Sequence, residues 1–319
     1  MSSLQFGAQV ALDVCLGVKK GETVLVIADQ GTKTVGSTLW EQAIELGTEA
    51  LYLEMLPRSV NGEEPPEAIA EAMKKAHVVI AATSKSLSHT KARREANQSG
   101  ARIASMPGVT GEMLARTMAA DYQRIKTLSH KIATILNAGN EAHITTPAGT
   151  NLTMSLKGRA AHPDTGMLQE RGSFSNLPAG EAYIAPMEGT SNGVLVIDGA
   201  MSGIGMLKGE VIHITVKDGY AIGIQGGQGA KVLEEMLKPL GRDAYNIAEL
   251  GVGTNDKAII TGNVLEDEKV LGTVHVALGN SVSFGGKVEV PIHLDGILLK
   301  PTLIVDGQEI LKEGTLMVS

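Results

Sequence analysis

The chain has 319 residues, a formal net charge of −7 and a sequence pI near 5.7, and it contains no run of lysine and arginine. These features disfavour nucleic acid and anionic membranes as partners, and no segment reaches the ~18 consecutive apolar residues that span a bilayer. Cys15 is the only cysteine, which excludes a disulfide framework and a thiolate metal cluster. We therefore expect a cytoplasmic protein that acts on a small molecule or a short peptide.

The first part of the chain alternates helical periods with short β-branched runs. We expect helices over residues 11–21, 36–47 and 65–76, and strands over residues 22–29, 49–55, 77–83 and 101–108. This alternation is typical of a parallel sheet with helices on both faces. The prediction is an α/β, Rossmann-like, doubly wound domain over residues 1–139. No glycine-rich nucleotide motif occurs in it, so we expect no nucleotide cofactor.

A long helical pattern over residues 120–139 leads into a region of different texture. From residue 140 onward, short strands are joined by glycine-rich turns, and residues 230–241 form the one strong helical pattern. Such a pattern predicts a mixed, mostly antiparallel, β-rich α+β domain over residues 140–319. We expect this second domain to carry the chemistry.

His293 and Asp295 lie two positions apart in an apolar strand, so their side chains point to the same face. Buried charges are expensive unless they are paired or bind a metal. Glu181, Glu249 and His275 also stand in apolar or glycine-rich surroundings, although each alone is interpreted as an exposed glutamate or a hydrogen-bonded core histidine. Together, two imidazoles and three carboxylates suit Zn²⁺, Mn²⁺, Co²⁺ or Fe²⁺. With a bridging carboxylate they are enough for two ions roughly 3.5–4 Å apart.

Other polar positions carry weaker signals. His89 and Arg93 follow the carboxyl end of a predicted parallel strand, where ligands gather, and we expect them to contact substrate. His162 and Asp164 are interpreted as ordinary turn residues. The acidic run over residues 266–270 is interpreted as a solvated loop.

Four segments, in this order, resemble a known family: GEAYIAP, AELGVG, GTVHVALG and HLD, spread from residue 180 to residue 295. The family is that of the thermophilic metallo-aminopeptidases (aminopeptidase T, M29), and the resemblance covers most of the chain. It implies a homodimer and a site that binds two divalent ions, Zn, Co or Mn. The implied ligands are Glu181, Glu249, His275, His293 and Asp295.

The resemblance has one departure. That family has a tyrosine shortly after its first histidine, whereas this segment offers only Ser281, Ser283 and Phe284. Phenylalanine cannot donate a hydrogen bond to an oxyanion, and losing such a donor typically costs about 10²–10³ in rate. The expected function is a slow aminopeptidase-like hydrolase that removes N-terminal residues from small peptides or cleaves small amides. Glu181 or Glu249 would serve as its catalytic acid and base.

Two alternatives remain. AIGIQGGQGA and VPIHLDG also look similar to the mononuclear Fe(II) ring-cleaving dioxygenases that act on dihydroxypyridines. In that branch the resemblance implies a two-His-one-carboxylate set, with a histidine in place of Glu249 and none at the position of His275. The presence of both residues favours the hydrolase. The second alternative is a non-catalytic small-molecule binding protein, which a loss of ligands would indicate.

Overall fold

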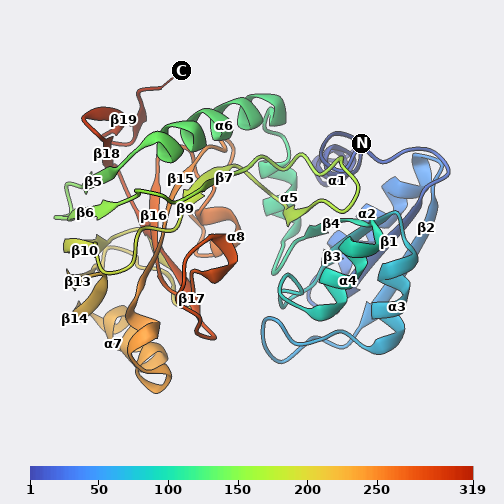
Figure 1. Cartoon of the computed structure of the whole chain (residues 1–319). Helices are drawn as coiled ribbons and strands as arrows, with labels where there is room; N and C mark the ends of the chain where they lie inside the picture. The colour runs from blue at the N-terminus through green and yellow to red at the C-terminus, as the bar shows by residue number, and fades with distance from the viewer. Residues whose placement is uncertain (319) are drawn as a thin grey trace. The chain divides into compact units, whose positions relative to one another are not determined.

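The computed structural model describes residues 1–318, which form two compact units (Figure 1). The first unit consists of residues 1–123 and 166–179, and the second of residues 124–165 and 180 onward. This division differs from the single expected boundary between residues 139 and 140. The chain leaves the first unit at the start of helix α6, Tyr122–Ala138, and later returns to add one strand to the first sheet.

The first unit contains a five-stranded parallel sheet in the order β2-β1-β3-β4-β8. Its strands are β1 (Thr23–Asp29), β2 (Glu49–Met55), β3 (Val78–Ala82), β4 (Arg102–Ser105) and β8 (Phe174–Asn176). β1 and β3 are almost wholly apolar because helices cover both faces of the sheet. The α/β class expected for this part of the chain is confirmed.

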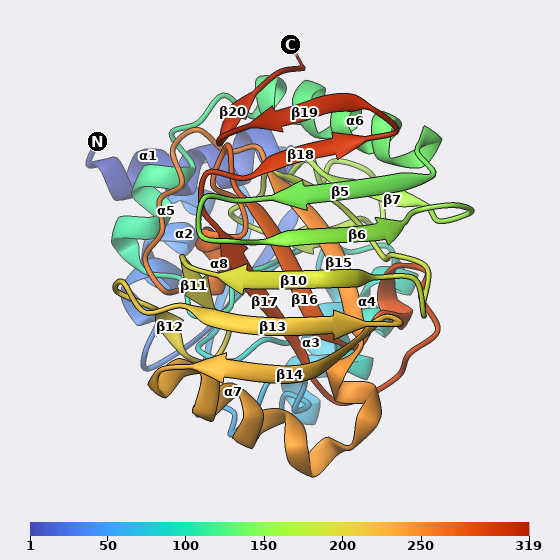
Figure 2. The same ribbon diagram turned by 90° about the vertical axis from the view of Figure 1, so that its left-hand side faces the viewer.

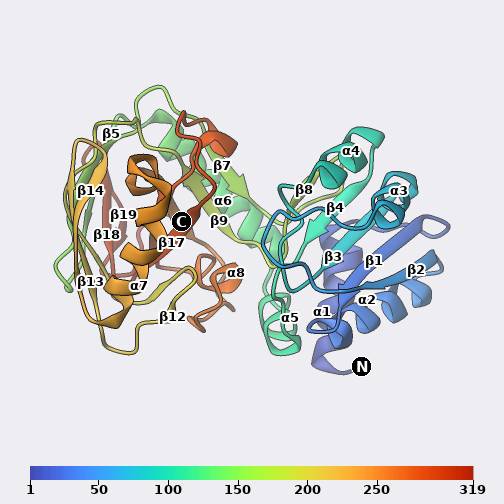
Figure 3. The ribbon, with the colours of Figure 1, turned by 90° about the horizontal axis from the view of Figure 1, so that it is seen from below.

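The helices of the first unit are α1 (Ser3–Val10), α2 (Lys33–Glu45), α3 (Glu67–Lys75), α4 (Lys91–Ser99) and α5 (Gly111–Thr117). α1 packs against α2 and α5, while α3 packs against α4 on the other face of the sheet (Figure 3). The helix expected over residues 11–21 is wrong in its bounds. The helical segment begins at Ser3, where Ser2 caps it, and continues through a π-helical turn that ends at Cys15.

The second unit contains two antiparallel sheets (Figure 2). The larger has the order β14-β13-β10-β6-β5-β18-β19-β20. Its strands are β5 (Glu141–Thr145), β6 (Asn151–Ser155), β10 (Asn192–Ile197), β13 (Ile212–Lys217), β14 (Tyr220–Gly226), β18 (Thr302–Val305), β19 (Gln308–Lys312) and β20 (Thr315–Leu316). The expected β-rich texture of this region is confirmed.

The smaller sheet has the order β12-β11-β17-β16-β15-β9-β7. Its strands are β7 (Ala161–Asp164), β9 (Glu181–Ile184), β11 (Ala200–Met201), β12 (Gly205–Met206), β15 (Ile247–Gly253), β16 (Val274–Gly279) and β17 (His293–Leu298). Besides α6, the α-helices of this unit are α7 (Gln228–Leu237) and α8 (Val264–Asp267). Within residues 1–318, no helix is long and apolar enough to cross a membrane.

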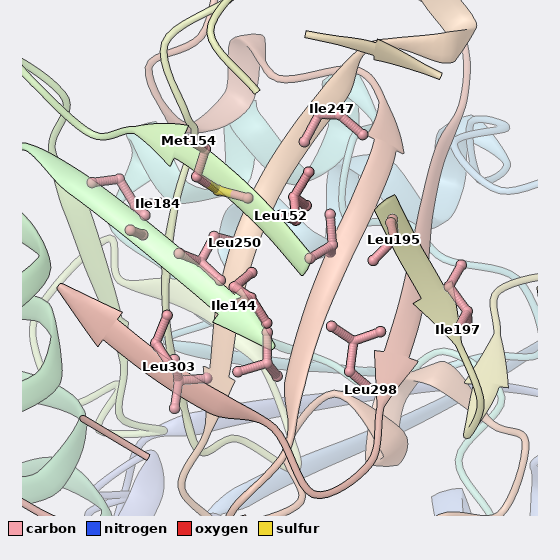
Figure 4. Close-up of a cluster of buried hydrophobic side chains, with 14 of the residues drawn as sticks. Ile144, Leu152, Met154, Ile184, Leu195, Ile197, Ile247, Leu250, Leu298 and Leu303 are labelled. Carbon is pink, nitrogen blue, oxygen red and sulfur yellow. The ribbon is translucent and has the colours of Figure 1, made fainter. Parts of the chain in front are cut away.

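Apolar side chains fill the space between the two sheets (Figure 4). Ile144, Leu152 and Leu195 from the larger sheet face Leu250 and Leu298 from the smaller one. Side chains alternate between the two faces of a strand, so the residues between these core positions point to the opposite face of the smaller sheet. That opposite face carries the titratable residues of the site.

Candidate metal centre

Five titratable side chains converge on the second unit's smaller sheet, and they are the five expected from the sequence. They form two groups of potential metal ligands that share Glu249. One group is Glu181, Glu249 and His275, and the other is Glu249, His293 and Asp295. The structure thus brings together all five of the predicted ligand positions.

Strand register explains why these residues meet. Glu249 on β15 is opposite Ala277 on β16, which is opposite Asp295 on β17. Directly opposite residues of antiparallel strands share a face, so the small side chain of Ala277 leaves the space between the two carboxylates open. A register irregularity between Ile247 and Glu249 lets Ile247 enter the core while Glu249 points to the site.

The group around His293 has a well-defined outer layer of hydrogen bonds. His293 Nε2 lies 3.1 Å from Glu249 Oε2 and 3.2 Å from Asp295 Oδ1. His293 Nδ1 lies 2.8 Å from the carbonyl oxygen of Asn280, which can only accept, so Nδ1 carries the proton. The Ser202 hydroxyl lies 3.4 Å from Asp295 Oδ2 and accepts the Asp295 N–H at 3.0 Å. Such partners orient metal-ligating side chains.

The group around His275 depends on a glycine. His275 is opposite Gly251 in the register, and a Cβ at Gly251 would collide with the imidazole ring. Without that Cβ, Nε2 of the fully buried His275 lies 3.2 Å from Glu181 Oε2 and 3.4 Å from Glu249 Oε1. Its Nδ1 is buried and has no hydrogen-bond partner among the described residues. Unlike His293, His275 therefore lacks an outer hydrogen bond that fixes its ring.

A buried lysine contacts the Glu181 end of the cluster. Lys269 Nζ lies 2.5 Å from Glu181 Oε1, 2.7 Å from Glu268 Oε1 and 3.4 Å from Asp164 Oδ2, and its side chain is 1% exposed. Asp164 is opposite Glu181 in the pairing of β7 with β9. The lysine thus supplies positive charge to two carboxylates that would otherwise repel each other across the strands.

These contacts correct two predictions. The run over residues 266–270 is not a solvated loop, because Glu266, Asp267 and Lys269 are buried. Glu266 accepts from the backbone of Ile259, and Asp267 accepts from the backbone of residues 261 and 262. His162 and Asp164 are not turn residues either, since both lie in strand β7, which Asp164 ends with a buried side chain.

Mutual contact shifts the pKa values of the cluster. Burial disfavours the charged imidazolium of His275 and His293, but the neighbouring carboxylates outweigh it and raise both pKa values well above the usual value. Burial also opposes ionisation of Asp295, yet His293 outweighs it and lowers the pKa of that carboxyl. Around the lysine, burial raises the pKa of Glu268 to about 8.

Aromatic rings lie beside the ligand candidates. The Phe284 ring lies edge-on to His293, with centroids 5.4 Å apart, and edge-on to Tyr183 at 5.8 Å. Tyr183 in turn stacks at a tilt on His162, 5.4 Å away. Burial raises the pKa of the Tyr183 hydroxyl, so it keeps its proton. Phe284 therefore contacts His293 through its ring and offers no polar atom.

The donor set fits a divalent metal ion. Two imidazoles and three carboxylates crowd together on one face of a sheet, where like charges would repel each other without a cation. Nε2 of His293 faces two carboxylates because its Nδ1 is held by Asn280. Imidazole and carboxylate ligands suit several first-row metals, so the set indicates a metal without selecting one.

His89 and Arg93, the expected substrate contacts, belong to the first unit. The Arg93 guanidinium lies 4.1 Å above the Phe174 ring centroid, and its Nε donates to the Ser88 carbonyl at 2.7 Å. Its Nη1 donates to the side chain of Asn97 at 3.2 Å. Much of Arg93's bonding capacity is therefore used inside its own unit, and a role in substrate binding remains a prediction.

Sequence reasoning missed Tyr183 and Lys269. The position of Tyr183 can be predicted from the sequence, because Tyr183 lies two positions after Glu181 in a strand and so shares its face. No feature of the sequence indicates that Lys269 is buried at the site, since a lysine in an acidic run is typical of a solvated surface. Its contact with Glu181 spans 88 positions of sequence and arises only from the fold.

The sequence also matches a known protein family. Residues 6–318 match the family model described as NicX: 2,5-dihydroxypyridine 5,6-dioxygenase. A 2,5-dihydroxypyridine 5,6-dioxygenase of Pseudomonas putida KT2440 is 25% identical over 215 residues, which are 64% of this chain and 61% of that protein. The match thus spans less than two thirds of that relative's length.

Two solved structures share the fold. The structure of 2,5-dihydroxypyridine dioxygenase from Pseudomonas putida KT2440 aligns with a TM-score of 0.83 at 20% identity, covering 100% of this chain and 99% of that one. Wild-type AmpT from Thermus thermophilus aligns with a TM-score of 0.70 at 18% identity, covering 99% of each chain. At such identities the likeness concerns the fold alone, and the fold expected from the sequence is confirmed.

The family match contradicts the expected function. The aminopeptidase-like hydrolase, with its proteolytic activity, is wrong as the principal interpretation, and the ring-cleaving alternative agrees better with the findings. The presence of Glu249 and His275 does not select the hydrolase, although the sequence alone favours it on this ground. A fold does not determine a reaction, so five suitable side chains indicate a metal site without determining what it catalyses.

Proposed function

Because the chain belongs to the NicX family of 2,5-dihydroxypyridine 5,6-dioxygenases, we propose that it is a metal-dependent dioxygenase that cleaves the ring of a dihydroxypyridine-like substrate. The match across residues 6–318 is the observation that carries this proposal. The buried cluster of imidazoles and carboxylates supports it, because such ligands suit a redox-active metal such as Fe²⁺.

Glu249, His293 and Asp295 would hold one Fe(II) ion. Hydrogen bonds order the surroundings of this group better than those of the other, since Asn280 orients His293 and Ser202 contacts Asp295. The group has one imidazole and two carboxylates, so Glu249 stands where the resemblance to the dioxygenases implies a second histidine. When bound, a ferrous ion supplies the redox chemistry by which dioxygen reacts with an electron-rich ring.

Other side chains would bind and orient the substrate. Tyr183 and Phe284 offer aromatic surface next to the ligand group, and flat rings pack well against other rings in stacked or edge-on arrangements. The protonated Tyr183 hydroxyl can donate a hydrogen bond. His275, whose pKa is raised by Glu181 and Glu249, keeps its own proton at Nε2 and adds positive charge beside the substrate rather than accepting a proton from it.

The decisive experiment measures oxygen uptake. Protein loaded with Fe(II) without oxygen is mixed with aerated 2,5-dihydroxypyridine, and we expect consumption of oxygen together with loss of the ring absorbance. His293→Gln is the matched control and should reduce the rate by at least about 10²-fold, because it removes the imidazole from the group. Iron-loaded protein that consumes no oxygen with 2,5-dihydroxypyridine or other dihydroxypyridines would contradict the proposal.

Two further expectations accompany the proposed function. A homodimer remains the expected assembly, and His89 and Arg93 remain the expected contacts of the first unit with the substrate. Sedimentation of the purified protein tests the first, and the Michaelis constant of an Arg93→Lys variant tests the second, because lysine lacks the planar guanidinium.

A further inference from the structure

The buried lysine of the site has no part in the proposed reaction. Lys269 is 1% exposed, and its ammonium lies within 3.4 Å of carboxylate oxygens of Glu181, Glu268 and Asp164. A lysine is almost never fully buried unless it is paired, so these contacts are what keeps it there. One charged nitrogen thus gathers three acidic side chains at one end of the cluster.

Backbone contacts hold the segment that carries Lys269 next to the site. Gly253 on β15 is opposite Glu181 on β9, and a Cβ at Gly253 would collide with the Val270 carbonyl. The Asn255 N–H donates to the Lys269 carbonyl at 2.8 Å, and the Leu271 N–H donates to the Asn255 carbonyl at 3.0 Å. These contacts fix the segment carrying Lys269 against the end of β15, so its side chain reaches Glu181.

We propose that the Lys269 ammonium takes the place of a second metal ion, so that the centre binds a single ion at Glu249, His293 and Asp295. The inference rests on the proposed function for a metal ion at these three residues, and it adds the group that keeps a second ion from binding. Two carboxylates at the Glu181 end, Asp164 and Glu181, are opposite each other and need a cation between them. A tethered ammonium meets that need without a metal, and a divalent ion bound beside it would face its positive charge.

The two histidines support this assignment. His293 has an outer hydrogen bond through Nδ1 to Asn280, whereas Nδ1 of His275 is buried and has no partner among the described residues. Metal-bound histidines almost always donate their second nitrogen to a partner. By this criterion His293 is prepared as a ligand, and His275 is better suited to hydrogen bonding with Glu181 and Glu249.

The test counts Mn(II) ions on the full chain and uses no substrate. Metal-free protein is titrated by calorimetry, and bound Mn(II) is then measured by elemental analysis and electron paramagnetic resonance. We expect one ion per chain in the wild type. Lys269→Met is close in size but uncharged, and it should bind a second Mn(II) near the first, giving a spin-coupled spectrum. The exposed Lys312→Met is the matched control and should bind one ion. Two ions in the wild type, or one in a folded Lys269→Met, would overturn the inference.

A second pair of variants covers the case in which Lys269→Met does not fold. Because Glu181 is engaged by the lysine, Glu181→Gln should still bind one Mn(II), with affinity reduced less than about 10-fold. Glu249→Gln removes a ligand and should lose about 10²-fold or more. Equal losses in the two variants would contradict the inference. A chain that binds one Mn(II) but cleaves no dihydroxypyridine when loaded with iron would contradict the proposed function and leave this inference standing.

Discussion

Gly251 has its place because the His275 ring occupies the position that a side chain would fill. A Gly251→Ala change would push the ring away from Glu181 and Glu249. We expect Mn(II) affinity to fall about 10-fold, as for other changes next to metal ligands. We also expect the free energy of unfolding to fall by about 1–3 kcal/mol, because the face is overpacked.

Calorimetric titration and urea unfolding measure these two effects. Gly223→Ala is the matched control, since a Cβ there would make only ordinary contact with Thr215, on the other sheet. If Gly251→Ala binds Mn(II) as tightly as the control, the packing of His275 against this glycine is not what positions the ring.

The histidines also give the metal-free protein a pH-dependent stability. Their pKa values are raised in the folded state, so their contribution is complete below the unfolded value of about 6.5 and is lost as pH rises through the folded values. The pKa of Glu268, raised to about 8, acts in the same direction between about pH 4.3 and 8. We therefore expect the free energy of unfolding in chelator to decrease from pH 6 to pH 9.

Urea unfolding at several pH values measures this slope. Asp295 acts in the opposite sense but at lower pH, because its lowered pKa adds stability that is present above about pH 3.9 and lost below it. His293→Gln should flatten the slope above pH 6.5. Saturating Mn(II) should reverse it, since the metal competes with protons for the same imidazole. A profile without slope in chelator would contradict the shifted histidine pKa values.

At the scale of elements, strand β15 separates stability from chemistry. Leu250 is fully buried between the sheets, while the neighbouring Glu249 points to the other potential metal ligands. Leu250→Ala should lower the free energy of unfolding by about 2–5 kcal/mol through loss of burial and a cavity. We expect the same Mn(II) stoichiometry as in the wild type, because the substitution lies on the other face. Urea unfolding measures the stability of Leu250→Ala, and metal analysis without denaturing urea measures its Mn(II) stoichiometry. Loss of metal binding with unchanged stability would contradict the assignment of one face of β15 to the core and the other to the metal site.

The alternation of side chains between the two faces of a strand makes part of the site predictable from the sequence. It places His293 and Asp295 on one face, and the resemblance implies Glu181, Glu249 and His275. The structure brings all five residues together. The buried Lys269 was missed because local composition says nothing about contacts that span 88 positions. The reaction cannot be predicted from these residues either, since ligand types constrain the metal more than they constrain the substrate.

At the scale of the whole molecule, the chain completes its first unit only after visiting the second. β8 pairs with β4, where the Ile103 N–H donates to the Ser173 carbonyl and the Leu177 N–H to the Ser105 carbonyl. No break in the sequence pattern marks this return, which is why a single boundary between residues 139 and 140 was expected. A fragment ending there would leave β4 as an unprotected edge.

This arrangement predicts how fragments behave. Residues 1–139 should unfold without a cooperative transition or aggregate. Residues 1–123 joined to 166–179 by a short glycine-serine linker should fold, because Gly166 packs closely on the buried Tyr122 and the two ends therefore lie near each other. The Ala179 N–H, 3.4 Å from the Tyr122 hydroxyl, fixes the other end of the added segment. Urea unfolding followed by circular dichroism compares the two fragments, with residues 166–179 in scrambled order as the matched control. If residues 1–139 unfold as cooperatively and at as high a urea concentration as the joined fragment, the returning strand is not needed for the first unit to fold.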